Sequence, residues 1–103
     1  MSPERYGRDV SRVFEVDLRL LRESDGGRGK SIRSGYRSIM RFGTAEAEPP
    51  WGVQLDFEAD ELRPGEEGNV RVSTWAEDDP PISAGTSVWL YEGARLVGTG
   101  KIR

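Results

Sequence analysis

The feature that most limits the fold of this chain is a repeated alternation of apolar and polar residues with a period of two. From Val13 to Leu21, large apolar residues alternate with charged ones, and the 3.6-residue period of a helix is absent. Successive side chains on a strand point to opposite faces, so this pattern is typical of an antiparallel strand with one buried face. Similar alternation recurs in Tyr36 to Phe42, Trp51 to Glu58, Val70 to Trp75 and Val88 to Tyr91, and Leu96 to Ile102 is expected to return as the last strand. We therefore expect six strands and no helix.

Glycine and proline separate these runs. Pro49-Pro50 precedes the third strand, a turn is expected over Leu62 to Asn69, and Glu92-Gly93-Ala94-Arg95 has the character of a hairpin turn. Gly98 and Gly100 lie inside the last strand, where glycine marks a bend or a close approach of another backbone. Short strands at even spacing predict a barrel or a sandwich, and closure of a barrel would hide the strand edges.

At 103 residues the chain is long enough for one domain, with residues 1–12 as a tail and residues 13–103 as the folded unit. It contains no cysteine and no histidine, so it lacks thiol chemistry, the commonest general base and the commonest ligand for soft metals. No run approaches the roughly 20 apolar residues of a membrane span. We expect a cytoplasmic, non-catalytic protein with no membrane partner.

Charge is distributed unevenly along the chain. Residues 1–43 carry ten Lys or Arg against six Asp or Glu, while residues 44–103 carry five against twelve, and the net charge is −3. This acidity argues against DNA as a partner, because non-specific DNA affinity requires many phosphate contacts. Five basic residues after Asp25 make a candidate RNA-binding surface, or alternatively a solvated face: Arg28, Lys30, Arg33, Arg37 and Arg41.

Three aromatic residues are expected on the outside of the strands. Trp89 and Tyr91 fall opposite Val88 and Leu90 by the period of two, and Trp75 is placed similarly after Thr74. An outward Trp–Tyr pair is either a cross-strand brace or a surface that contacts a partner. Homodimerisation is a further arrangement that the same side chains allow.

Three short motifs resemble functional sites but lack their context. Gly29-Lys30-Ser31 follows glycines at the wrong spacing for a nucleotide-binding loop, and no helix pattern comes after it. Glu77-Asp78-Asp79-Pro80-Pro81 is interpreted as a solvated turn, because its prolines prevent a calcium-loop geometry. Adjacent carboxylates such as Asp60-Glu61 do not set the geometry of acid–base catalysis. We expect no catalytic residue, metal or cofactor.

Taken together, the motifs resemble the C-terminal β-barrel, or third domain, of bacterial elongation factor Tu. The resemblance spans Phe14 to Ile102 and depends on matches at the family's spacing: Phe14-Glu15, Leu21, Gly26-Gly27-Arg28, Gly35-Tyr36-Arg37, Phe42 with Thr44, Pro64-Gly65, and Glu92-Gly93-Ala94-Arg95-Leu96-Val97-Gly98-Thr99-Gly100. It implies an all-β, six-stranded, closed antiparallel Greek-key barrel without a catalytic site. In the family this barrel contacts the GTPase domain, the nucleotide exchange factor and the T-stem of aminoacyl-tRNA.

The resemblance also implies particular contact residues. Arg37 matches the arginine of the family's Gly-Tyr-Arg, and Glu92-Gly93 match the turn that lies against the T-stem. Ile39 replaces an amide of the family, and Glu48 stands near a family threonine; both changes disfavour RNA.

Two functions are therefore predicted. The first is a translation-associated module that binds tRNA or other structured RNA, or a translation factor, through the five basic residues and Glu92-Gly93. The second is a protein-interaction module that mimics the third domain. It would dock to a translation GTPase, or to another protein that recognises elongation factor Tu, through Trp75, Trp89 and Tyr91.

Overall fold

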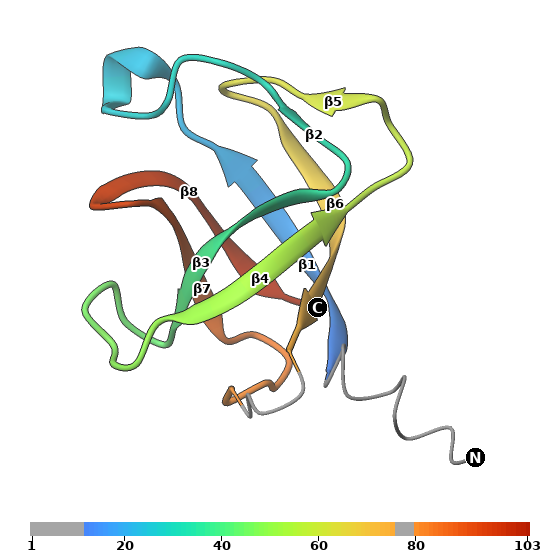
Figure 1. The fold of residues 1–103 in the computed structure, drawn as a ribbon, viewed down its shortest axis with the longest axis vertical. Helices are drawn as coiled ribbons and strands as arrows, with labels where there is room; N and C mark the ends of the chain where they lie inside the picture. Colours follow the sequence, from blue (N-terminus) through green and yellow to red (C-terminus); the bar gives the residue numbers. More distant parts are fainter. Residues whose placement is uncertain (1–11, 76–79) are drawn as a thin grey trace.

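The computed structural model describes residues 12–75 and 80–103, and six of its strands form a closed barrel (Figure 1). The barrel strands are β1 (Val13–Leu20), β3 (Tyr36–Phe42), β4 (Trp51–Asp56), β6 (Glu67–Thr74), β7 (Ser87–Glu92) and β8 (Arg95–Ile102). They pair in the order β1-β6-β4-β3-β7-β8, and β8 returns to β1. All pairs are antiparallel. The prediction of a closed six-stranded antiparallel barrel is confirmed.

The connections follow a Greek-key pattern. Strands β3, β4 and β6 are neighbours in space in the order of the chain, and the long connection from β1 to β3 lets β6 pair with β1. Tyr36 of β3 pairs with Leu55 of β4, and Leu55 in turn pairs with Val72 of β6. This arrangement places β6, β4, β3 and β7 side by side, so their outward faces form one continuous surface.

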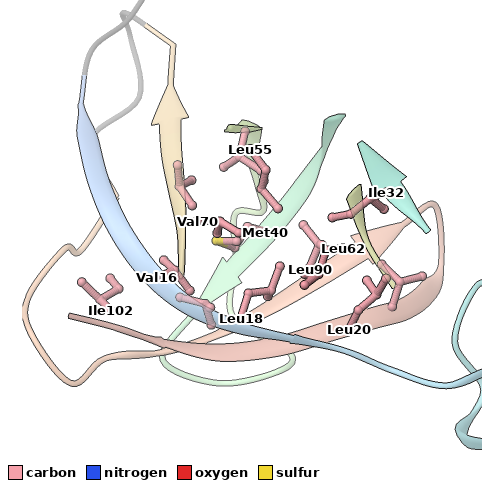
Figure 2. Close-up of a cluster of buried hydrophobic side chains, with 14 of the residues drawn as sticks. Val16, Leu18, Leu20, Ile32, Met40, Leu55, Leu62, Val70, Leu90 and Ile102 are labelled. Atoms are coloured by element: carbon pink, nitrogen blue, oxygen red, sulfur yellow. The ribbon is translucent and has the colours of Figure 1, made fainter. Parts of the chain in front are cut away.

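The inward face of each strand supplies the core. Along β1, Val16, Leu18 and Leu20 are fully buried, and the residues between them face outward (Figure 2). Met40 and Leu55 meet them from the opposite wall. Each position is the apolar member of a period-two pattern, so the alternation in the sequence correctly predicts the buried face.

A small second sheet closes one end of the barrel and was not predicted. It consists of β2 (Ile32–Arg33) and β5 (Glu61–Leu62), which pair antiparallel (Figure 1). Ile32 and Leu62 are both buried and extend the core beyond the ends of the six long strands. Two-residue strands are too short to show a period, which explains why the sequence suggested only connections there.

Two boundaries also differ from expectation. The turn predicted over Leu62 to Asn69 is shorter, because Leu62 belongs to β5 and β6 already begins at Glu67. The glycine-rich connection contains one turn of 3₁₀ helix, η1 (Glu23–Asp25), which ends at Gly26 with a positive φ of 91°. The expectation of no helix is therefore wrong for these three residues.

The glycines of β8 have the predicted role. A side chain at Gly100 would overlap the backbone carbonyl oxygen of Asp17 on β1, and a Cβ at Gly98 would lie 3.2 Å from the carbonyl oxygen of Arg19. Glycine therefore allows β8 to approach β1 and close the barrel. Among the described residues, none belongs to a helix of the length and apolarity that a bilayer crossing requires.

Candidate binding face

The candidate site is a patch of eight residues on the outward side of β3, β4 and β7 and just after the end of β6, which we call the outer face. It is defined by Arg37, Ile39, Arg41, Gly52, Gln54, Trp75, Trp89 and Tyr91.

The strand register places these residues in rows across the sheet. Ile39 of β3 lies opposite Gly52 of β4 on one side and opposite Tyr91 of β7 on the other. Val53 pairs with Thr74, so the next step of the register places Trp75 beside Gly52. The row through the centre of the outer face is therefore Trp75, Gly52, Ile39 and Tyr91.

Arg37 lies on one side of this row. Its Nε donates a hydrogen bond to Gln54 Oε1 at 2.9 Å, and its guanidinium carbon lies 5.4 Å from the centroid of the Trp75 ring. Gln54 Nε2 in turn donates to the Asp56 carboxylate at 3.1 Å. Within the described residues Arg37 forms no ion pair, so its charge is held against an aromatic ring but not neutralised.

Arg41 lies on the other side and is held differently. Its guanidinium carbon is 5.5 Å from the centroid of the Tyr91 ring, and its Nη1 is 2.8 Å from Glu48 Oε2. The same Nη1 donates to the carbonyl oxygen of Ala47 at 2.6 Å, and Tyr91 Oη donates to that of Ala45 at 3.0 Å. Arg41 and Tyr91 thus hold the β3–β4 loop together, and the charge of Arg41 is balanced by Glu48.

The two tryptophans differ in exposure. Trp75 is 36% exposed, one of the two large apolar side chains that stand out most among the described residues, and Trp89 is half-buried beside Arg41. Trp75 is therefore the more exposed of the two tryptophans, while Tyr91 is fixed by its hydrogen bond to the β3–β4 loop.

A second cluster joins residues that the sequence also placed in an RNA site. Arg28 Nε lies 2.9 Å from Glu92 Oε2 without the alignment of a hydrogen bond, so this contact is an ion pair. Arg28 Nη1 donates to the carbonyl oxygen of Ser31 at 2.5 Å, and Tyr36 Oη donates to Glu92 Oε2 at 2.5 Å. Burial, and then the hydrogen bond to Glu92, raise the pKa of Tyr36 to about 12.

This second cluster ties the β7–β8 turn to the glycine-rich connection. Gly93, with a φ of 62°, allows the tight turn that brings Glu92 beside Arg28. The charge of Arg28 is therefore paired with that of Glu92, although its Nε–H makes no hydrogen bond among the described residues.

The remaining basic residues lie apart from both groups. Lys30 is exposed in the glycine-rich connection, and Arg33 is exposed on β2 opposite Glu61 of β5. The five basic residues thus occupy several separate places.

The structure brings Arg37 and Arg41 together with all three predicted aromatic residues on the outer face. It adds Gly52 and Gln54, which the sequence patterns did not indicate. A glycine at an outward position of an alternating strand, the second residue of β4, was the signal that could have identified Gly52.

Within the described ranges, no three Asp or Glu residues are arranged to hold a metal ion. The acidic turn at Glu77 to Pro81 lies mostly outside those ranges.

By its fold the chain is a small closed antiparallel β-barrel domain. No model of a known protein family matches its sequence.

Proposed function

We propose that this chain is a non-catalytic binding module of the type found in the C-terminal domain of elongation factor Tu, and that it binds a protein of the cytoplasmic translation machinery through the outer face. The observation that supports this proposal is the gathering of two arginines of β3, Trp89 and Tyr91 of β7, and Trp75 just after β6 on one side of the barrel. Trp, Tyr and Arg are the residues most enriched among those that dominate protein-binding energy.

Charge pairing favours a protein over RNA. Arg28 is held in a partly buried ion pair with Glu92, and the whole chain carries a net charge of −3. RNA affinity depends on cations that are free to neutralise phosphates. A surface in which aromatic rings hold arginines in place is better suited to a partner that buries both.

The direct test is binding to a purified fragment of elongation factor Tu that retains its first two domains and lacks its own third domain. Calorimetry would compare the unmodified chain with Trp75→Ala, Trp89→Ala and, as a control outside the outer face, Arg71→Ala. We expect each tryptophan variant to lose about 2 kcal/mol, roughly 30-fold in affinity, and the control to bind normally. Absence of binding, or binding that is indifferent to both tryptophans, would refute the proposal.

RNA binding is a second candidate, because Lys30, Arg33 and Arg37 are exposed and form no ion pair within the described residues. It is tested by titrating labelled deacylated tRNA across a salt series. Binding whose salt slope shrinks by about 1 when Arg37 is replaced by alanine would establish the RNA candidate and displace the protein proposal.

A further inference from the structure

Neither the backbone angle at Gly52 nor a close contact with another described residue requires a glycine at this position. Of the twelve described glycines, seven have positive φ angles, which other residues rarely adopt. At four others a Cβ would stand within 3.3 Å of a neighbouring atom: Gly27, Gly68, Gly98 and Gly100. At Gly52 the φ angle is ordinary, and a Cβ would meet nothing within 4 Å.

This glycine lowers the stability of the barrel without a compensating contact. Glycine in the interior of a strand loses more backbone entropy on folding than other residues and contributes no side chain to the sheet. A glycine that no internal contact requires is expected where another chain approaches the backbone closely. The approach must come from outside, because Gly52 faces solvent on the outer face.

The surroundings of Gly52 determine the shape of that approach. Ile39 on β3 is half-buried beside it, and Trp75 follows β6 on its other side. Between these two apolar side chains Gly52 presents only its backbone, and we call this bare position the notch. A large apolar side chain of a partner fits this notch, whereas a charged one would be desolvated without a counter-charge.

The arginines determine the charge on either side of the notch. Arg37 and Arg41 lie two residues before and two residues after Ile39 and face the same way. Four residues of strand span about 13 Å. Arg37 has no carboxylate partner among the described residues, and the Glu48 carboxylate that pairs with Arg41 is 71% exposed, so a partner can replace it at little cost.

We propose that the outer face docks an extended segment of a partner protein in which one large apolar residue is flanked, two positions away on each side, by Asp or Glu. The apolar side chain enters the notch over Gly52, and the carboxylates meet Arg37 and Arg41. An extended segment has the same period of two as β3, so the three side chains match the three positions on the outer face. This inference rests on the proposed function and specifies the chemistry of the partner.

The test uses amide NMR of the labelled chain with the synthetic peptide Ser-Thr-Glu-Thr-Leu-Thr-Glu-Thr-Ser. Two control peptides replace the leucine with serine, or both glutamates with lysine. We expect saturable shifts of the Gly52 amide and of the Trp75 indole N–H, and none at the amide of Asn69, which lies on β6 opposite Asp17. Both control peptides should bind at least tenfold more weakly.

Gly52→Val blocks the notch and is expected to fold at least as stably as the unmodified chain, so any loss of binding is not a loss of structure. It should weaken the peptide at least tenfold, while the matched control Asn69→Val should bind normally. Absence of shifts at millimolar peptide, or shifts that persist in Gly52→Val, would overturn the proposal. So would a uridine octanucleotide that shifts the same groups when the peptide does not.

The proposed translation partner and the proposed peptide docking at the notch can be refuted independently of each other. If the elongation factor fragment binds in a tryptophan-dependent way and Gly52→Val binds it normally, the binding function stands and the notch does not. If the peptide binds through the notch and the fragment does not bind, the notch stands and the translation partner is wrong.

Discussion

The ionisation of Tyr36 should make the barrel less stable in alkaline solution. The pKa of Tyr36 is raised from 10.0 to about 12, first by burial and then by the hydrogen bond to Glu92. The folded chain therefore keeps the phenolic proton at a pH at which the unfolded chain has lost it. This contribution to stability is fully present below pH 10 and is lost as the pH rises toward 12.

The size of this loss in unfolding free energy follows from the shift in the pKa of Tyr36. Two pKa units correspond to an upper limit of about 2.7 kcal/mol. Because Tyr36 is only half-buried, solvent screening reduces this, and we expect about 1 to 1.5 kcal/mol. That is a large share of the stability of a small domain.

The assay is urea unfolding at several pH values from 8 to 12, with Tyr36→Phe as the reference. The variant lacks the ionisable group, so the difference in unfolding free energy between the two proteins isolates Tyr36 from all other titrations. We expect this difference to be constant up to about pH 10 and then to fall by about 1 to 1.5 kcal/mol. A difference that stays constant to pH 12, or that rises, would refute the described environment of Tyr36.

Three further substitutions test the packing. Leu18→Ala should destabilise the barrel by about 2 to 5 kcal/mol in urea unfolding, because Leu18 is fully buried in the core; a loss below about 1 kcal/mol would contradict this. Gly100→Ala should cost about 2 kcal/mol or more, because its Cβ overlaps the Asp17 carbonyl, and near-neutral behaviour would disprove this close approach. Glu67→Gln should change thermal stability by less than about 1 kcal/mol, because the Glu67 ion pair with Arg19 is more than half exposed on both sides; a larger loss would show a stronger coupling than the 3.4 Å contact implies.

The sites on this barrel show why charge in a sequence is an incomplete guide to a binding surface. Arg28, Arg37 and Arg41 follow one another within a short basic stretch, yet within the part of the chain that the structure describes only Arg37 of the three has no carboxylate partner. Glu92, which pairs with Arg28, comes from the opposite end of the chain, whereas Glu48, which pairs with Arg41, lies in the loop that directly follows β3. The acidic half of the chain thus neutralises part of the basic half when the barrel closes.

The sequence alone determined the class of the fold and the inner face of five of the six barrel strands, whereas an irregularity in the pairing of β8 buries Val97 next to Gly98. Alternation in β1, β3 and β4 predicts which side chains enter the core, because a period of two gives one buried and one exposed face whatever the neighbouring strand. The outward placement of Trp89 and Tyr91 followed from the same rule. Glycines in β8 were correctly expected at a close approach.

Only the tertiary structure decided which outward residues meet. The row from Trp75 through Gly52 and Ile39 to Tyr91 joins four strands whose order around the barrel differs from their order in the chain. The sheet of β2 and β5 likewise forms because two short segments are brought together over one end of the core. Contacts of this kind depend on strand order and register, which local alternation does not encode.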